Sequence, residues 1–227
     1  MKATHVIPES YTLFGEFNPV RYKKAPWAAY PLSLLVAVAS YFFFNNLVSI
    51  LRPDFQSFTI AHVHFEITIE RLLIVLGLAV LILVLFSVHE GIHAFFLWIF
   101  THARPRLVAT LKGAGGFGIS LPAWYLPRDA FLMTDLAPVV LITFAGMLLL
   151  MIVPAAYLRQ LVFCIAIHLA SSIGDIVSAI FVIFLPATAY MNTDGAVYTR
   201  ASIEPEEVRG WQQYIRRLME QILTKLE

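Results

Sequence analysis

Charged residues are scarce in this chain. Asp, Glu, Lys and Arg make up 14% of its 227 residues, whereas hydrophobic residues make up 59% and the mean hydropathy is +0.75. An ordinary soluble domain has an apolar share nearer about 45–50%, so the composition argues against that class. The formal net charge is +1 and no block of Lys and Arg is present, which argues against a nucleic-acid partner. We therefore expect an integral membrane protein whose partner is membrane lipid.

Cysteine is also nearly lacking, since Cys164 is the only one. One cysteine excludes an intramolecular disulfide and a cysteine-based metal cluster, and its apolar neighbours predict a packing role. No internal repeat or low-complexity segment is visible. A cleaved signal peptide is not predicted, because about 30 residues with several charges precede the first apolar run. We expect that run to stay in the mature protein.

Four apolar runs are long enough to cross a bilayer, which takes roughly 20 residues. They are Pro31–Leu51, Leu72–Phe100, Leu136–Tyr157 and Leu161–Pro186. The last two are separated only by Leu158, Arg159 and Gln160, so we expect them to form a tight antiparallel helical hairpin. The fold class predicted is an all-α membrane protein with four transmembrane helices, whose core is residues 31–186.

Basic residues indicate the orientation, because cytoplasmic loops collect Lys and Arg. Four of them precede the first run, and four more lie between the second and third runs. Both termini are therefore expected in the cytoplasm, with residues 1–30 and 187–227 as cytoplasmic segments. The second helix would then carry its last turns in the cytoplasmic half of the membrane.

A polar, glycine-rich stretch follows the second run. Arg106–Leu111 and Phe117–Leu121 both alternate as strands do, with the turn-forming Gly113–Gly116 between them. We interpret this stretch as a short β-hairpin at the membrane surface, whose unpaired edge could accept an extended peptide as a further strand. A loop without regular structure is the alternative, because a hairpin of this size is marginal alone.

Two other segments carry weaker signals. After Ser202, which can cap a helix, apolar residues recur every three or four positions, at Val208, Trp211, Ile215, Leu218 and Ile222. This pattern predicts an amphipathic C-terminal helix that could lie on the bilayer, dock on a cytoplasmic loop or pair with a second subunit in a homo-oligomer. The segment 52–71 has a weak strand signal, and we interpret its His62 and His64 as solvated.

The motif His89-Glu90-Gly91-Ile92-His93 lies inside the second apolar run. Histidines four residues apart share one face of a helix, and the glutamate between them lies close enough to polarise a water at a metal. This is the pattern of zinc proteases. Ionisable groups at membrane depth are costly, so they indicate function. The motif predicts zinc ligands at His89 and His93 and a general base at Glu90.

A catalytic zinc usually takes three protein ligands, and we assign the third to Asp175. Glu90 and Asp175 are the only carboxylates within the four predicted spans. Residue counts from the outer ends place Asp175 and His89 at similar depths. Ser171 and Ser172 lie one turn before Asp175 and could hydrogen-bond its carboxylate or a bound water.

Two further residues have an open role. His168 lies two turns before Asp175 and could assist the site, although a histidine satisfied by a neighbouring helix is an equally good interpretation. Asp194 competes for the third-ligand role, because Asn192-Thr193-Asp194-Gly195 resembles a motif that donates an aspartate in many intramembrane zinc proteases. That motif normally has a proline that is missing here, and the segment is also typical of a turn.

These residues together resemble the putative zincin peptidase family, small bacterial and archaeal membrane proteins distantly related to the site-2-protease-type metalloproteases. The matching pieces are His89–Ala94, Ala137-Pro138 and Ser171–Ile176. The resemblance implies zinc at His89, His93 and Asp175, Glu90 as the base, a prokaryotic cell membrane, and cleavage of membrane-embedded or membrane-proximal peptide bonds. The chain departs from the better-known site-2 proteases in two ways. Their Asn-Pro-Asp-Gly or Leu-Asp-Gly element is absent from the fourth span, and we expect no appended PDZ or cystathionine-synthase-like domain.

The leading hypothesis is an intramembrane zinc endopeptidase that acts near the cytoplasmic face on a membrane-protein or peptide substrate. The sequence does not indicate which residues bind that substrate. One rival is a membrane zinc enzyme that acts on a lipid or another small hydrophobic molecule. A second is a non-catalytic or transport protein in which Glu90 and Asp175 carry protons, although four spans are few for a transporter and no inverted repeat is visible.

Overall fold

The computed structural model describes residues 2–16, 25–54, 69–110, 116–121 and 123–200. These residues form two compact units, each built from segments distant in the sequence. We call Leu32–His89 with Pro138–Ile173 the helical unit. We call the remainder, Met1–Pro31, Glu90–Ala137 and Gly174–Glu227, the mixed unit, because its described part contains both helix and sheet. The long helices α2 and α3 each begin in one unit and end in the other.

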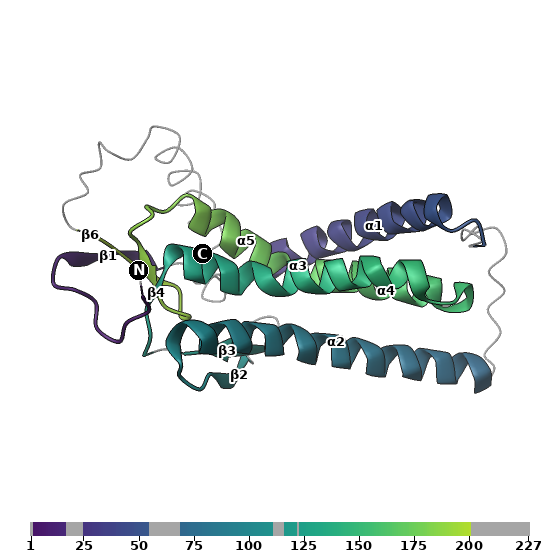
Figure 1. Cartoon of the computed structure of the whole chain (residues 1–227), viewed down its shortest axis with the longest axis horizontal. Coiled ribbons are helices and arrows are strands. Elements are labelled where there is room, and N and C mark those ends of the chain that lie inside the picture. The colour runs from purple at the N-terminus through teal and green to yellow at the C-terminus, as the bar shows by residue number, and fades with distance from the viewer. Residues whose placement is uncertain (1, 17–24, 55–68, 111–115, 122, 201–227) are drawn as a thin grey trace. The chain divides into compact units, whose positions relative to one another are not determined.

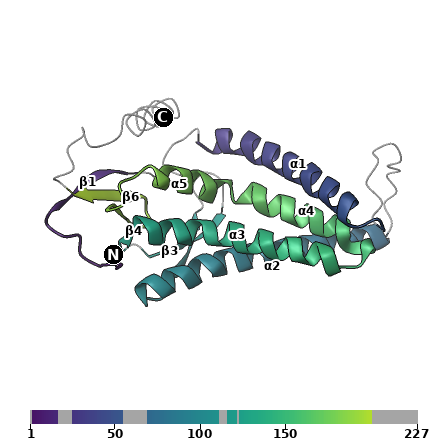
Figure 2. The same cartoon turned by 45° about the horizontal axis from the view of Figure 1, so that its top comes forward.

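The helical unit is held together by apolar contacts among three helices. Its core consists of residues from α1 (Ala25–Leu51), α3 (Arg128–Ile152) and α4 (Ala155–Ser171), which lie alongside one another in Figure 2. The buried members are Phe44, Val48, Leu150, Leu158, Val162 and Ile165. Helices α3 and α4 approach closely at Gly146, where an added Cβ would lie 2.8 Å from Cγ1 of Ile165. Such small residues let helices pack in a membrane, where water does not drive them together.

The described helices suggest a membrane protein. Three of them are long and apolar enough to cross a bilayer, over Tyr30–Leu51, Leu72–Thr101 and Arg128–Ile152. The outward surfaces of these helices are apolar, as at Leu34, Leu76 and Leu148. A fourth span requires α4 and α5 (Ile173–Ile183) to act together, since they meet at a bend of 47°.

The structure corrects the boundaries of two of the predicted spans. The third helix begins at Arg128 rather than Leu136 and ends at Ile152 rather than Tyr157. The turn therefore lies at Val153-Pro154, because proline lacks the N–H that would continue the helix. Leu158–Gln160, the expected turn, is part of α4. The predicted fourth helix, Leu161–Pro186, is also not continuous, because it breaks at Ser172 and ends at Ile183.

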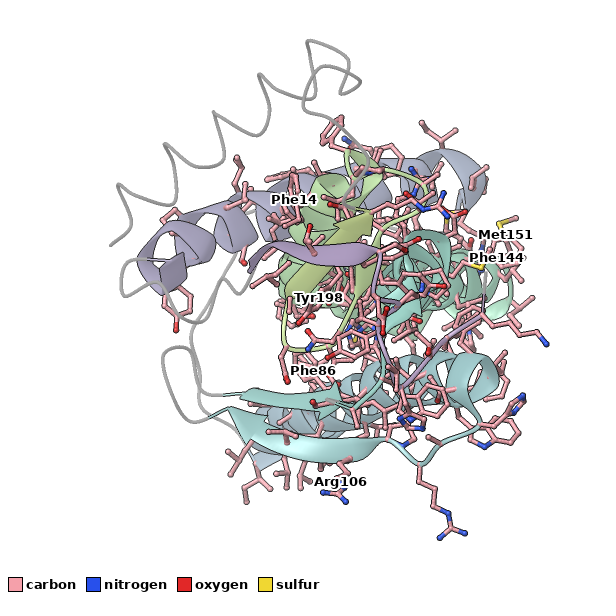
Figure 3. The ribbon with its side chains drawn as sticks, turned by 90° about the vertical axis from the view of Figure 1, so that its left-hand side faces the viewer. Phe14, Phe86, Arg106, Phe144, Met151 and Tyr198 are labelled. Atoms are coloured by element: carbon pink, nitrogen blue, oxygen red, sulfur yellow. The ribbon has the colours of Figure 1, made fainter. Side chains whose placement is uncertain are left out.

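A four-stranded antiparallel sheet in the mixed unit was not predicted, so the expectation of an all-α protein was incomplete. Its strand order is β1-β6-β5-β4, with β1 at Tyr11–Glu16, β6 at Ala196–Arg200, β5 at Tyr190–Met191 and β4 at Leu126–Pro127. Figure 3 views β1 and β6 with their residues Phe14 and Tyr198 labelled. Phe14 packs on a buried cluster formed by the following residues: Val182, Leu185, Ala189, Met191 and Val197. The sheet thus joins residues near the two ends of the described chain to α5.

The predicted β-hairpin is confirmed. Strands β2 (Arg106–Thr110) and β3 (Gly116–Ser120) pair in antiparallel register, with Arg106 opposite Ser120 and Thr110 opposite Gly116. Figure 1 shows the hairpin beside the C-terminal end of α2. In Figure 3 the side chain of Arg106 projects away from the two strands of the hairpin. Helix α2 (Ile69–Thr101) ends immediately before His102, whose positive φ of 54° reverses the chain toward β2.

Three expectations fall outside the described residues. The first is the strand signal in segment 52–71 with its histidines His62 and His64, because residues 55–68 are not described. The second is the glycine turn at 113–116, of which only Gly116 is described. The third is the amphipathic helix after Ser202.

Candidate metal centre

Both histidines of the motif lie on one face of α2, four residues apart. The side chains of His89 and His93 are well covered, with 6% of His89 exposed and 12% of the His93 side chain exposed. The helix forms here because residues 69–101 contain no proline and consist of an almost unbroken apolar run. Two imidazoles are thus held one turn apart on a helix that is long enough to cross a membrane.

His93 is oriented by the backbone of α3. Its Nδ1 atom lies 2.9 Å from the carbonyl oxygen of Thr134. A carbonyl can only accept a hydrogen bond, so Nδ1 carries the proton and donates it. The lone pair of a neutral ring is then on Nε2, which lies 3.7 Å from Oδ1 of Asp175. Metal-binding histidines are commonly fixed in this way, by donating the other ring N–H to a carbonyl or carboxylate.

Asp175 reaches the histidines because the chain breaks just before it. At the end of α4, the hydroxyls of Ser171 and Ser172 both donate to the carbonyl oxygen of His168, at 2.7 and 2.9 Å, and the N–H of Ser172 donates to it as well. Serine hydroxyls that bond back to the preceding turn bend helices. Helix α5 starts at Ile173 in the new direction and carries Asp175 in its first turn.

The serine pair therefore acts differently from the prediction. Ser171 and Ser172 were expected to bond the Asp175 carboxylate or a bound water, but their hydroxyls are directed to a backbone carbonyl. The prediction assumed a continuous helix, in which residues three and four positions apart face one another. Here the two serines help to form the bend instead.

The three proposed ligands do come together. One ligand atom from each of His89, His93 and Asp175 can be chosen so that all lie within 4.8 Å of one another. Two ligand atoms of a tetrahedral zinc with bonds of about 2.1 Å are about 3.4 Å apart, which is close to the 3.7 Å between His93 and Asp175. Two imidazoles and one carboxylate are also a donor set that catalytic zinc uses. These residues fit a zinc ion with an open position.

His168 lies against the first histidine rather than beside the aspartate. Its side chain is completely buried, and its ring contacts that of His89 edge to face, with centroids 5.3 Å apart. Both residues belong to the helical unit. The structure therefore places His168 where its ring supports the orientation of His89.

The competing aspartate is held in a turn. Oδ1 of Asn192 accepts hydrogen bonds from the N–H groups of Asp194 and Ala196, and Gly195 has a φ of 90°. This confirms the expectation of a turn over Asn192–Gly195. Asp194 is not a member of the ligand group formed by the described residues, whereas Asp175 is. The neighbouring Thr193 instead accepts the N–H of Leu121, which ties this turn to the end of β3.

A cavity of about 260 Å³ opens beside His93 and Asp175, within the mixed unit. Glu90, the proposed base, lies on its wall, together with Gly118 and Ile119 from β3. The acidic side chain of Glu90, two candidate metal ligands and a strand therefore share one cavity.

One carboxylate at this cavity was missed in the sequence. Asp135 lines it, beside Thr134. The third span was predicted to start at Leu136, which left Asp135 outside the search for buried acids by one residue. The signal that could have found it is Pro127-Arg128-Asp129, since proline and an acidic residue are typical of a helix start and α3 does begin at Arg128.

Residues 82–190 match the family model described as putative zincin peptidase. The match supports that family for this chain, and it suggests a zinc metallopeptidase. It includes the C-terminal part of α2, which carries both histidines, and the whole of α5 with Asp175. No curated protein and no solved structure gives a significant match.

Proposed function

We propose that this zincin-like chain is a membrane-embedded zinc endopeptidase, which hydrolyses a membrane-spanning or membrane-adjacent peptide near the cytoplasmic face. The observation that carries the proposal is the ligand group of His89, His93 and Asp175 on helices apolar enough for a bilayer. Glu90 on the adjoining cavity wall supports it. Acidic groups in such a helix are costly and are seldom present without a role.

Each group at the site has a distinct task in this proposal. His89, His93 and Asp175 would hold the zinc ion, which when bound supplies a Lewis acid that polarises a carbonyl and acidifies a water. The Glu90 carboxylate accepts one proton from the attacking water and passes it to the leaving nitrogen. The remaining hydroxide adds to the carbonyl carbon, the C–N bond breaks as the nitrogen takes the proton from Glu90, and the products are a carboxylic acid and an amine.

The hairpin supplies a way to hold the substrate. Strand β3 pairs with β2 along one edge, and no other described strand pairs with it. Its residues Gly118 and Ile119 lie on the cavity wall with Glu90. A peptide that adds to β3 as a further strand would be extended, with its carbonyls regularly spaced beside the site. This favours a peptide over a lipid as the substrate, because an acyl chain has no backbone groups to pair.

The test compares wild type with Glu90→Gln. The variant should keep its zinc, measured by elemental analysis of purified protein, because Glu90 is not a proposed ligand, and it should lose turnover by a factor of at least about 10². Quantitative proteomics of membranes from cells that express each form should show uncleaved substrates only with Glu90→Gln. The matched control is Glu9→Gln, which alters an exposed glutamate and should behave as wild type.

The same membranes can also distinguish the rival functions. Undiminished cleavage by Glu90→Gln would exclude the proposed base. A lipid profile that differs between the two forms, with no change in any peptide, would replace the peptidase by a lipid-directed enzyme.

A further inference from the structure

One acidic side chain at the cavity has no part in the hydrolysis described above. Asp135 lies about two turns into α3 and lines the cavity with Glu90, His93 and Asp175. It is close enough to both His93 and Asp175 for their charges to interact. A carboxylate in a helix that crosses a membrane is costly, so its presence here requires an explanation.

Asp135 makes one defined contact, to α5. The side chain of Ser178 hydrogen-bonds its carboxylate. The other oxygen, Oδ2, is buried and accepts no hydrogen bond from the described residues. Ser178 lies three residues after Asp175, so both side chains project from the same face of α5. The contact therefore joins α3 to α5 one turn away from the proposed ligand.

Such a contact is needed because of the break at Ser172. The direction of α5 does not follow from that of α4, since the two helices meet at 47°. The position of Asp175 then depends on what α5 packs against. The hydrogen bond between Asp135 and Ser178 supplies a polar, directional contact at that point, whereas apolar packing alone fixes rotation about the helix axis less strictly.

The charges of Asp135 and Asp175 also indicate that this contact belongs to a metal centre. Two carboxylates placed side by side in a weakly polar environment repel each other, so the approach of Asp135 to Asp175 would be unfavourable at a site that never holds a cation. A dication ligated by Asp175 reverses the sign of the local interaction. The pair of acids therefore fits a metal centre better than it fits a purely structural contact.

We propose that Asp135 is a positioning residue of the metal centre: through Ser178 it holds α5 so that the Asp175 carboxylate faces Nε2 of His93. The neighbouring Thr134 carbonyl fixes the ring of His93 from the same turn of α3. One turn of α3 thus positions a ligand on α2 and a ligand on α5. This inference rests on the proposed zinc site.

Cobalt binding tests the proposal, because the visible absorption of Co²⁺ reports both affinity and coordination geometry. The full chain, purified in nanodiscs, is titrated with Co²⁺ as wild type, Asp135→Ala, Ser178→Ala and the double variant. Each single change should weaken binding by about 10–100-fold, as loss of groups behind metal ligands does. The double variant should bind no more weakly than the weaker single variant, because both changes remove one contact.

A conservative variant separates positioning from general damage. Asp135→Asn keeps the size of the side chain and can still hydrogen-bond Ser178, so it should restore most of the affinity and the wild-type absorption spectrum. Unchanged affinity in Asp135→Ala and Ser178→Ala, losses that multiply in the double variant, or an Asp135→Asn protein that binds as weakly as Asp135→Ala would each overturn the proposal. Matched controls are Asp129→Ala, an exposed acid on the same helix, and Ser87→Ala on α2; both should bind as wild type.

Asp175→Ala distinguishes this inference from the proposed function. Tight Co²⁺ binding that survives Asp175→Ala would refute the metal centre and the peptidase with it. Binding that is lost in Asp175→Ala but unaffected by Asp135→Ala and Ser178→Ala would refute only the role of Asp135.

Discussion

The Nδ1 atom of His93 donates to the carbonyl oxygen of Thr134 across 2.9 Å. This bond decides which nitrogen of the ring faces Asp175 and is available to a metal. Because the acceptor is a backbone carbonyl, no side-chain substitution at Thr134 removes it, and the orientation of His93 depends on where α3 runs.

The first prediction follows from this bond. In zinc-loaded protein labelled with ¹⁵N-histidine, His93 should coordinate through Nε2 while Nδ1 keeps its proton, because Nδ1–H is already engaged by Thr134. The two states give different ¹⁵N chemical shifts, and His93→Gln identifies the signal by its loss. A zinc-induced shift at Nδ1 of His93 would show that the ring turns over on binding.

The second prediction concerns the third ligand. Asp175→Ala should reduce zinc content to well below one ion per chain, since its carboxylate is in the ligand group. Asp194→Ala should leave zinc content unchanged, because the turn that contains Asp194 is held by Asn192. Elemental analysis of both purified variants measures the difference. The opposite pattern would transfer the ligand role to Asp194.

The third prediction tests the cavity wall. A Cβ added at Gly118 meets nothing within 4 Å, so Gly118→Leu should fold and bind zinc normally. Its side chain would occupy space in the cavity next to Glu90, and turnover should fall by about 10-fold or more through exclusion of the substrate. Gly77→Leu, on α2 with equally open surroundings, is the control. Full activity in Gly118→Leu would place the substrate elsewhere.

The fourth prediction concerns packing in the helical unit. Gly146→Ala should lower stability by about 1–3 kcal/mol, because its Cβ would lie 2.8 Å from Cγ1 of the buried Ile165. Thermal unfolding in detergent measures the effect. Ile165→Val should relieve part of the loss by removing Cδ1, which would also lie within 3 Å of the new carbon. Gly77→Ala should be neutral or stabilising, because alanine favours helix.

The fifth prediction concerns Arg52, which hydrogen-bonds backbone carbonyl groups at the C-terminal end of α3. Its guanidinium donates to the carbonyl oxygens of Leu150, Met151 and Val153 and bonds Asp54 at 2.7 and 2.9 Å. Arg52→Ala leaves these carbonyls without the donor and should lower the melting temperature. Arg52→Lys should recover only part of the lost melting temperature, since a single ammonium group cannot make all the hydrogen bonds of the planar guanidinium.

The same contact gives a pH dependence. The hydrogen bond from Arg52 holds the pKa of Asp54 below its ordinary value. The stabilisation is therefore complete above about pH 4, near the unfolded value, and is lost as the pH falls through the lower folded pKa. Wild type should lose stability in that window slightly more than Asp54→Asn does. Equal slopes would show that the pair contributes nothing, which is common for exposed ion pairs.

Several elements could be predicted because their causes are local. The apolar runs of α1 and α2, the alternation in β2 and β3, and the turn at Asn192–Gly195 depend on nearby residues, and the structure agrees with each. The site histidines were found for the same reason, since spacing on a helix is a local property. The start of α3 was predicted too late, and that error hid Asp135.

The sequence by itself determined that apolar helices form and that His89, Glu90 and His93 share one turn of a helix, because helix geometry and side-chain hydrophobicity act over a few residues. Only the tertiary structure decided that Asp175 meets them, that α5 bends away from α4, and that β1 pairs with β6 across most of the chain. Those outcomes depend on packing and hydrogen bonds between residues far apart in sequence. No local pattern specifies which distant groups will meet.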